Sequence, residues 1–230
     1  MIVGHGMLAR AFASRYAKDT RTLIFASGVA DSDERAPSAF EREQRLLDEH
    51  LTTHAGRFVY FGSCSAADAD RCETPYVRHK LAMEARVLDH AGGLILRLPQ
   101  VVGRTDNPHT LANFLYRAIR DGEHFTVWRR AERNLVDVDD VVAIAAEFID
   151  GRQSAGAIVT IAAEKSLPVP EIVAIFERLL GRRGHYDLLE KGAPLTIDAG
   201  PALAVAAALG RPLTGDYVET VLAKYHGRDA

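Results

Sequence analysis

The start of the chain places a glycine turn between a short strand and a helix. Residues 1–3 form a brief apolar strand, Gly4-His5-Gly6-Met7-Leu8-Ala9 follows, and residues 10–17 continue as a helix. Glycine allows the backbone to turn tightly and leaves room for another group to approach it. A strand, a glycine turn and a helix in this order predict an α/β fold with a parallel sheet, and no other feature restricts the fold as much.

The same turn has a chemical interpretation. The first turn of a helix presents backbone N–H groups without partners, and the helix dipole is positive at that end. A pyrophosphate binds well at such a place, and the pattern matches the dinucleotide fingerprint. The alternative is a tight turn without a ligand, and the motif alone leaves both interpretations open.

Beyond the turn, apolar strands alternate with helical segments. We expect strands at 1–4, 22–26, 57–62 and 94–98, with later strands at 124–128 and 158–161. Helices are expected at 38–50, 76–90, 111–121, 139–150 and 169–180, with one or two more between 200 and 226. This alternation predicts parallel strands joined by right-handed crossovers.

A second motif follows the strand at 57–62. Tyr76 and Lys80 are four residues apart on a predicted helix, so they share one face. An ammonium group beside a phenol stabilises the phenolate, and we therefore expect Lys80 to lower the pKa of Tyr76. Such a tyrosine can transfer a proton at a carbonyl or alcohol carbon. A half-buried tyrosine beside a solvated lysine is the common alternative for this spacing.

Together and in this order, the two motifs resemble the short-chain dehydrogenase/reductase superfamily, in its extended branch of NAD-dependent epimerases and dehydratases. Residues 57–63 resemble the strand that delivers the family's catalytic serine or threonine. Residues 94–103 are similar to the strand and loop beside the nicotinamide, and residues 133–141 resemble the family's R-D-F-V-H-V-D-D-V element. The resemblance covers nearly the whole chain.

The resemblance implies a role for each matching residue. Ser63, Tyr76 and Lys80 are expected to be catalytic, and Ser65 and Arg133 to bind substrate. The expected cofactor is NAD or NADP, with no metal. Its expected binding residues are Gly4, His5, Gly6, Met7, Leu8, Ser27, Gly28, Lys80, Leu98, Pro99 and Val101. The implied activity is that of an NAD(P)-dependent epimerase or ketoreductase acting on a nucleotide-linked sugar, as in pathways to surface polysaccharides.

The chain also departs from the family pattern. A single helix separates the glycine turn from residues 22–28, so the segment for the family's second and third strands is missing. We interpret 22–26 as the family's fourth strand. The alternative makes it the second strand, with Asp31 as the ribose ligand. In both cases the adenosine side of the cofactor pocket is reduced.

The expected architecture is therefore a Rossmann-like parallel sheet flanked by helices, reduced in strand number. We expect one domain over 1–230, with a core at about 1–110 plus interleaved later elements, and a small C-terminal substrate lobe mainly at 111–230. Two other functions stay open. The protein could have lost dinucleotide binding and bind a nucleotide sugar without redox chemistry, or it could be a non-catalytic partner subunit.

Composition narrows the class of protein. The chain has 230 residues, 47% hydrophobic and 26% charged, which is ordinary for a globular enzyme. A net charge of −3 argues against a nucleic-acid binder. No apolar run is long enough to cross a bilayer, and Cys64 and Cys72 do not suggest a disulfide framework or a zinc site. With a strand beginning at residue 1 we expect no leader peptide and a cytoplasmic location.

A homodimer is also expected. The helices at 38–50 and 76–90 carry more apolar side chains than one face of a sheet needs. Two such helices from each subunit would form a four-helix interface with two-fold symmetry. The side chains concerned are Leu46, Leu47, Leu51, Leu81, Met83 and Leu88.

Overall fold

The computed structural model describes residues 1–67, 74–151 and 156–227, so Cys72 lies outside the described residues. The chain divides into two compact units. Unit 1 comprises Met1–Leu98 and Val138–Ile161, and unit 2 comprises Pro99–Asp137 and Ala162–Ala230. The expectation of one domain with a substrate lobe stays a prediction.

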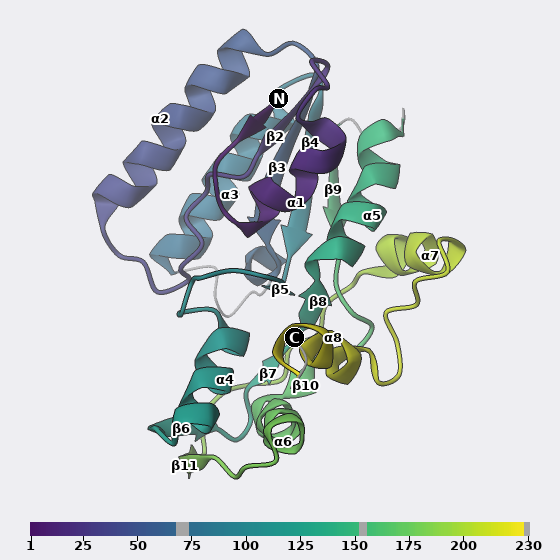
Figure 1. Ribbon diagram of the computed structural model, residues 1–230. Coiled ribbons are helices and arrows are strands. Elements are labelled where there is room, and N and C mark those ends of the chain that lie inside the picture. Colours follow the sequence, from purple (N-terminus) through teal and green to yellow (C-terminus); the bar gives the residue numbers. More distant parts are fainter. Residues whose placement is uncertain (68–73, 152–155, 228–230) are drawn as a thin grey trace. The chain divides into compact units, whose positions relative to one another are not determined.

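Unit 1 is built on a five-stranded parallel sheet in the order β1-β2-β3-β4-β9 (Figure 1). Helices α1 and α5 cover one face of this sheet, and α2 and α3 cover the other. One row of paired residues crosses the sheet from edge to edge: Ile2, Ile24, Val59, Leu94 and Ala157. The sequence prediction of a parallel α/β fold is confirmed.

The elements of unit 1 follow the expected alternation, with most boundaries moved by only a few residues. They are β1 (Ile2–Val3), α1 (Met7–Tyr16), β2 (Thr22–Phe25), α2 (Pro37–Thr53), β3 (Arg57–Ser63), a 3-10 turn (Cys64–Ala67), α3 (Pro75–Leu88), β4 (Gly93–Leu98), α5 (Val138–Asp150) and β9 (Ala157–Thr160).

The strand order decides between the two interpretations of residues 22–26. In the doubly wound order 3-2-1-4-5-6, the second strand lies on the far side of the first strand from the fourth. Here β2 lies between β1 and β3, so it takes the place of the fourth strand. The preferred interpretation is confirmed, and Asp31 does not follow a second strand. As a result, β1 forms an edge of this sheet.

The core between the sheet and the α2–α3 layer explains the apolar runs of β2 and β3. Strands covered on both faces are continuously apolar because no side chain along them reaches water. The buried residues of this core are Leu23, Phe25, Leu47, Phe58, Tyr60, Met83, Val87 and Ile95.

This core accounts for part of the apolar surface assigned to a dimer. Leu47 and Met83 are 0% and 1% exposed, so they offer nothing to a second copy. Leu46, Leu51 and Leu88 are partly buried against the same core. The homodimer stays a prediction that rests on these three leucines and on Leu81, which is partly buried against a neighbouring cluster.

Unit 2 contains three two-stranded sheets and four helices in its described residues. Strands β5 and β8 pair in parallel, as do β6 and β11, whereas β7 and β10 are antiparallel. Its core lies among α4, α6, α8 and β6. The elements are β5 (Gln100–Val102), α4 (Leu111–Asp121), β6 (His124–Trp128), β7 (Glu132–Arg133), β8 (Leu135–Asp137), β10 (Leu167–Pro168), α6 (Val169–Leu180), β11 (His185–Leu189), α7 (Gly200–Ala208) and α8 (Tyr217–His226).

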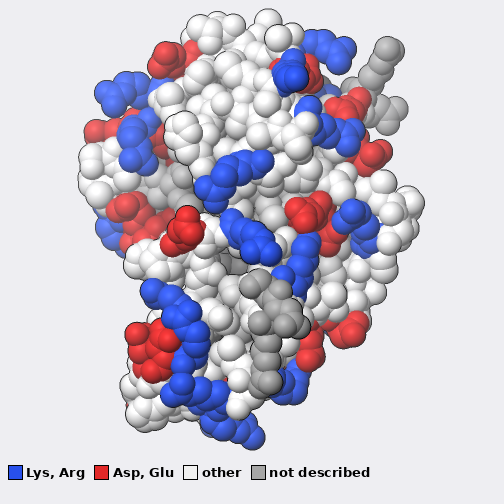
Figure 2. All heavy atoms as spheres, viewed as in Figure 1, with Lys and Arg blue, Asp and Glu red and all other residues white. Residues whose placement is uncertain are grey.

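The surface carries charges of both signs. On the face drawn in Figure 2, lysine and arginine side chains are interspersed with aspartate and glutamate side chains. Of the helices in the described part of the chain, none combines the length and apolar character that crossing a bilayer requires.

The glycine turn provides a test of the local backbone. Gly4 has a φ of +119°, and a Cβ there would clash with the carbonyl oxygen of Ala26. Gly6 has nothing within 4 Å of the corresponding position. We expect Gly4→Ala to lower the free energy of unfolding by about 2 kcal/mol or more. Gly6→Ser, at the N-cap of α1, should change it by less than about 0.5 kcal/mol. Equal urea midpoints for the two variants would contradict this backbone assignment.

Candidate active site

The candidate site lies in unit 1, where β2 and β3 end and α3 begins. The carboxyl ends of parallel strands are the usual place for ligands in open α/β sheets. Ser63 is the last residue of β3. Thr74 caps α3 by accepting a hydrogen bond from the N–H of Val77 at 3.2 Å. The first two turns of α3 then carry Tyr76 and Lys80.

Tyr76 and Ser63 are brought together as the sequence predicted. Tyr76 is 7% exposed, and a hydrogen bond with Ser63 favours its phenolate. The backbone N–H of Ser65 donates to Ser63 Oγ at 3.2 Å, which helps to orient that hydroxyl group. Ser63 is therefore the serine that meets the tyrosine, and Ser65 lies beside it in the 3-10 turn.

Lys80 is not a solvated lysine. It is 3% exposed, and its Nζ lies 5.8 Å from the centroid of the Tyr76 ring. The ammonium group donates to Glu43 Oε1 at 3.2 Å and to the hydroxyl oxygen of Tyr60 at 3.1 Å. This rules out the common alternative for the tyrosine–lysine spacing.

Glu43, near the middle of α2, was missed by the sequence analysis. Its side chain is completely buried and ion-paired with Lys80. Its carboxylate also accepts from the N–H of Val29 at 2.6 Å and from Tyr60 at 2.7 Å, and His79 Nε2 lies 3.0 Å from Oε2. The sequence did contain a signal that Glu43 would be buried. Glu43 and Leu47 are four residues apart, so Glu43 shares a helix face with a core leucine.

The charges of this network correct one expectation. Burial raises the pKa of Tyr76 to about 12, with the hydrogen bond from Ser63 opposing it and the charge of Glu43 adding to it. The predicted lowering of the Tyr76 pKa is therefore wrong for the protein's own groups. The main reason is burial of the phenol, and the Lys80 charge does not offset it because a carboxylate 3.2 Å away balances that charge.

The end of β2 lies directly against this ion pair. A Cβ on Gly28 would lie 2.7 Å from Lys80 Nζ and 2.9 Å from Glu43 Oε1, so a larger residue would displace them. Ser27 precedes Gly28 and is partly buried. The strand end assigned to the cofactor thus lies beside the lysine assigned to catalysis.

The glycine turn has the features that a pyrophosphate needs. Gly6 is the N-cap of α1 and makes no side-chain capping hydrogen bond, and Met7 and Leu8 begin the helix. Gly4 and His5 line a groove of about 700 Å³ that runs along β1 and α1. The turn fits a dinucleotide phosphate, whereas the sheet ends at β1, where the adenosine side would need further strands.

Four of the predicted residues lie farther along the chain. Leu98 ends β4 and is 6% exposed. Pro99, Val101 and Arg133 belong to unit 2, where Val101 pairs with Val136 and Arg133 with Leu167. The joint action of these unit 2 residues with unit 1 stays a prediction.

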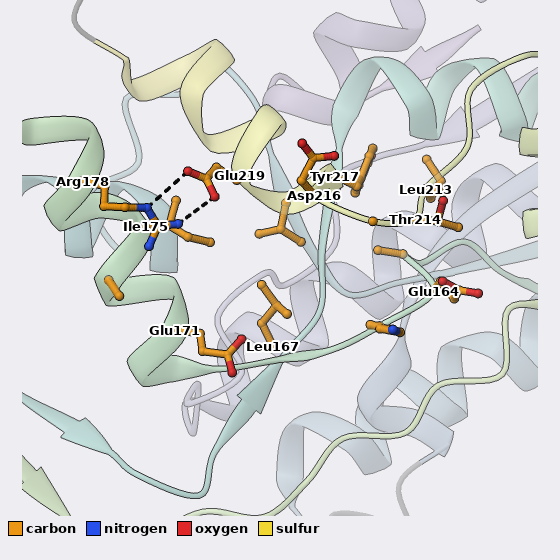
Figure 3. A pocket seen from close by; sticks show the side chains of 15 residues that line it. Glu164, Leu167, Glu171, Ile175, Arg178, Leu213, Thr214, Asp216, Tyr217 and Glu219 are labelled. Carbon is orange, nitrogen blue, oxygen red and sulfur yellow. Dashed lines mark hydrogen bonds and ion pairs between the residues drawn. The ribbon is translucent and has the colours of Figure 1, made fainter.

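Unit 2 has a hollow of its own, of about 280 Å³, between α6 and the start of α8 (Figure 3). On its wall Arg178 forms an ion pair with Glu219 at 2.7 Å. It includes none of the residues predicted from the sequence. Over residues 1–67, 74–151 and 156–227, no three His, Cys, Asp or Glu side chains form a group suited to a metal ion.

The parallel sheet order and the glycine turn at the start of α1 are those of a Rossmann-like α/β protein. The sequence profile of the NAD dependent epimerase/dehydratase family matches residues 25–162, more than half of the chain. The chain therefore belongs to this family. The glycine turn lies outside the matched range.

Solved structures agree on the fold. MoeE5 in complex with UDP-glucuronic acid and NAD has a TM-score of 0.72 and is 23% identical, covering 88% of this chain and 77% of its own. The UDP-glucuronic acid 4-epimerase from Bacillus cereus has a TM-score of 0.71 at 14% identity, covering 96% and 77%.

The UDP-glucose 4-epimerase from Thermus thermophilus has a TM-score of 0.70 at 17% identity, covering 96% of this chain and 81% of its own. At such identities the likeness shows the fold. A search of curated proteins found no match.

The buried carboxylate predicts a specific acid sensitivity. Burial tends to raise the pKa of Glu43, but His79, Lys80, Tyr60 and Val29 lower it from 4.5 to about 2. Because the folded-state pKa is depressed, this stabilisation is present above pH 4.5 and is lost as the pH falls toward 2. It amounts to roughly 3 kcal/mol.

We therefore expect the stability difference between the wild type and Glu43→Gln to shrink by this amount from about pH 6 to about pH 2. Urea unfolding at several pH values measures the difference. A difference that stays constant with pH would show that the pKa of Glu43 is the same in the folded and unfolded states, and would contradict this prediction.

Proposed function

We propose that this protein is an NAD(P)-dependent epimerase or ketoreductase that acts on a nucleotide-linked sugar. The observation that carries the proposal is the convergence of Ser63, Tyr76 and Lys80 beside the end of β2. Family membership supports the reaction class. Complexes of structural relatives with UDP-glucuronic acid and NAD support the choice of substrate and cofactor.

Each residue has a defined task in this proposal. Ser63 donates a hydrogen bond to the reacting oxygen of the sugar. Tyr76 is protonated at neutral pH because its pKa is about 12, so it is suited to give a proton to an oxygen that gains charge. Lys80 places a positive charge close to the phenol and stabilises the phenolate that remains.

The cofactor would be held by the residues of the glycine turn and of the strand ends. The N–H groups at the start of α1 would bind the pyrophosphate. The positive φ of Gly4 shapes the turn, and the open space at Gly6 leaves room for the ligand. Ser27, Gly28 and Leu98 would border the nicotinamide half. When bound, a nicotinamide dinucleotide supplies the hydride acceptor or donor. We further propose that Ser65 and Arg133 bind the substrate.

A second function is favoured by one observation. Because β1 is an edge of the sheet, the strands that normally support the adenosine are missing from the described part of this unit. A protein that binds a nucleotide sugar without a dinucleotide would tolerate this loss. Fluorescence titrations with NADH and NADPH separate the two functions, since only the first requires binding.

Removing the phenol tests the chemistry. Tyr76→Phe removes the acid–base group and keeps the packing against Val29 and Val77. We expect turnover to fall by roughly 100-fold or more, the usual scale for general acid–base catalysis, with the circular dichroism spectrum unchanged. Wild-type turnover of a UDP-sugar by this variant would show that the tyrosine is structural.

Closing the glycine turn tests cofactor binding. A Cβ at Gly6 would have no atom within 4 Å outside the adjoining backbone, so we expect Gly6→Val to fold while filling the space for the pyrophosphate. We expect at least a tenfold weaker affinity for the dinucleotide, about 1.4 kcal/mol. Gly6→Ala is the smaller control. An affinity equal to that of the wild type would place the pyrophosphate elsewhere.

A further inference from the structure

Glu43 connects α2 to three parts of the candidate site. Through Lys80 and His79 it contacts α3, through Val29 it contacts the chain just after β2, and through Tyr60 it contacts β3. None of its side chain is exposed to solvent. A carboxylate buried to this extent destabilises the fold unless it is fully paired. Its position is therefore explained by the groups with which it pairs.

The contact between Glu43 and Lys80 fixes the direction of the lysine side chain. An ammonium group has three N–H donors. Among the described residues, Glu43 Oε1 and the Tyr60 hydroxyl accept two of them, at 3.2 and 3.1 Å. One N–H of Lys80 is left for an oxygen of a ligand, and the ammonium lies against the backbone of Gly28.

The contact between Glu43 and Val29 fixes the backbone beside Tyr76. The N–H of Val29 donates to Glu43 Oε2 at 2.6 Å. The side chain of Val29 packs in one buried cluster with Tyr76 and Val77. The Glu43 carboxylate thus holds Lys80 through an ion pair. It also fixes the backbone of Val29, whose side chain packs in the same cluster as Tyr76.

We propose that Glu43 is a positioning residue that holds the Lys80 ammonium and the Val29 backbone where proton transfer at Tyr76 requires them. This inference rests on the proposed function of the site. Glu43 acts through Lys80 and Val29 and does not itself contact the reacting groups.

The other charged and titratable groups around Lys80 either pair with a different residue or interact with its charge more weakly than Glu43 does. Glu84, one turn farther along α3, is paired with Arg97 at 2.7 Å. The phenols of Tyr60 and Tyr76 face Lys80 from β3 and α3, and His79 contacts Glu43 rather than the lysine. Glu43 is therefore the direct counter-ion of Lys80, and without it burial would favour the neutral amine.

The first experiment reads the charge of Lys80 without using enzymatic activity. The chain has few lysines, so the Lys80 side-chain NMR signal can be assigned with Lys80→Met and titrated with pH. We expect Glu43→Gln to lower the pKa of Lys80 by about one pH unit or more. Glu43→Asp keeps the carboxylate and should recover most of this difference.

A matched control is available on the same two helices. Asp48 on α2 pairs with Arg86 on α3 at 2.8 Å, and both side chains are about two-fifths exposed. Asp48→Asn therefore breaks an α2–α3 ion pair away from the site. It should leave the pKa of Lys80 and the turnover unchanged.

The second experiment measures turnover of a UDP-sugar against pH. In Glu43→Gln we expect kcat to fall by roughly tenfold or more with KM within about threefold, and the alkaline limb to move to lower pH. An unchanged Lys80 pKa, or a wild-type kcat profile in Glu43→Gln, would overturn the inference. Inactivity of the wild type with every nucleotide sugar would instead refute the proposed function, while the Lys80 titration would still test the contact.

Discussion

The ion pair between Lys80 and Glu43 is the interaction on which the rest of the site depends. The side chains of Lys80 and Glu43 are 4% and 0% exposed, so each charge would be strongly destabilising alone. Removing one partner of such a pair typically costs about 3–5 kcal/mol because a charge stays buried without compensation. The packing of α2 against α3 therefore has to keep these two side chains together, and Tyr60, His79 and Val29 supply the remaining hydrogen bonds.

This pairing changes the chemistry expected from the motif. A lysine with an unbalanced charge would lower the pKa of the neighbouring tyrosine. Here the charge is balanced, and burial raises the pKa of Tyr76 to about 12. At neutral pH the site holds a protonated phenol next to a hydroxyl group, an arrangement suited to donating a proton to an oxygen. The protonation state of the proposed acid–base group thus follows from burial and charge balance rather than from the tyrosine–lysine spacing.

The reduced sheet of unit 1 keeps one part of a Rossmann-like architecture and shortens another. The part that holds the proposed catalytic residues is retained, with Ser63 at the end of β3 and Tyr76 and Lys80 on α3. The part that would support an adenosine is shortened, because the sheet of unit 1 ends at β1. The glycine turn remains at this edge, and the φ of +119° at Gly4 lets the backbone pass closely over Ala26.

The sequence by itself determined the features that depend on neighbours along the chain. Hydrophobic runs, the glycine turn and the four-residue spacing of Tyr76 and Lys80 are local patterns, so the strands, the helices and the shared helix face could be predicted. The tertiary structure decided between the two interpretations of residues 22–26 by placing β2 between β1 and β3. It alone established that Glu43, 37 residues before Lys80, is the counter-ion of that lysine. Contacts of this kind depend on how helices pack over a sheet, and the pKa of a buried group depends on all of them at once. For that reason the sequence could place Tyr76 and Lys80 together but could not predict which charge would balance the lysine.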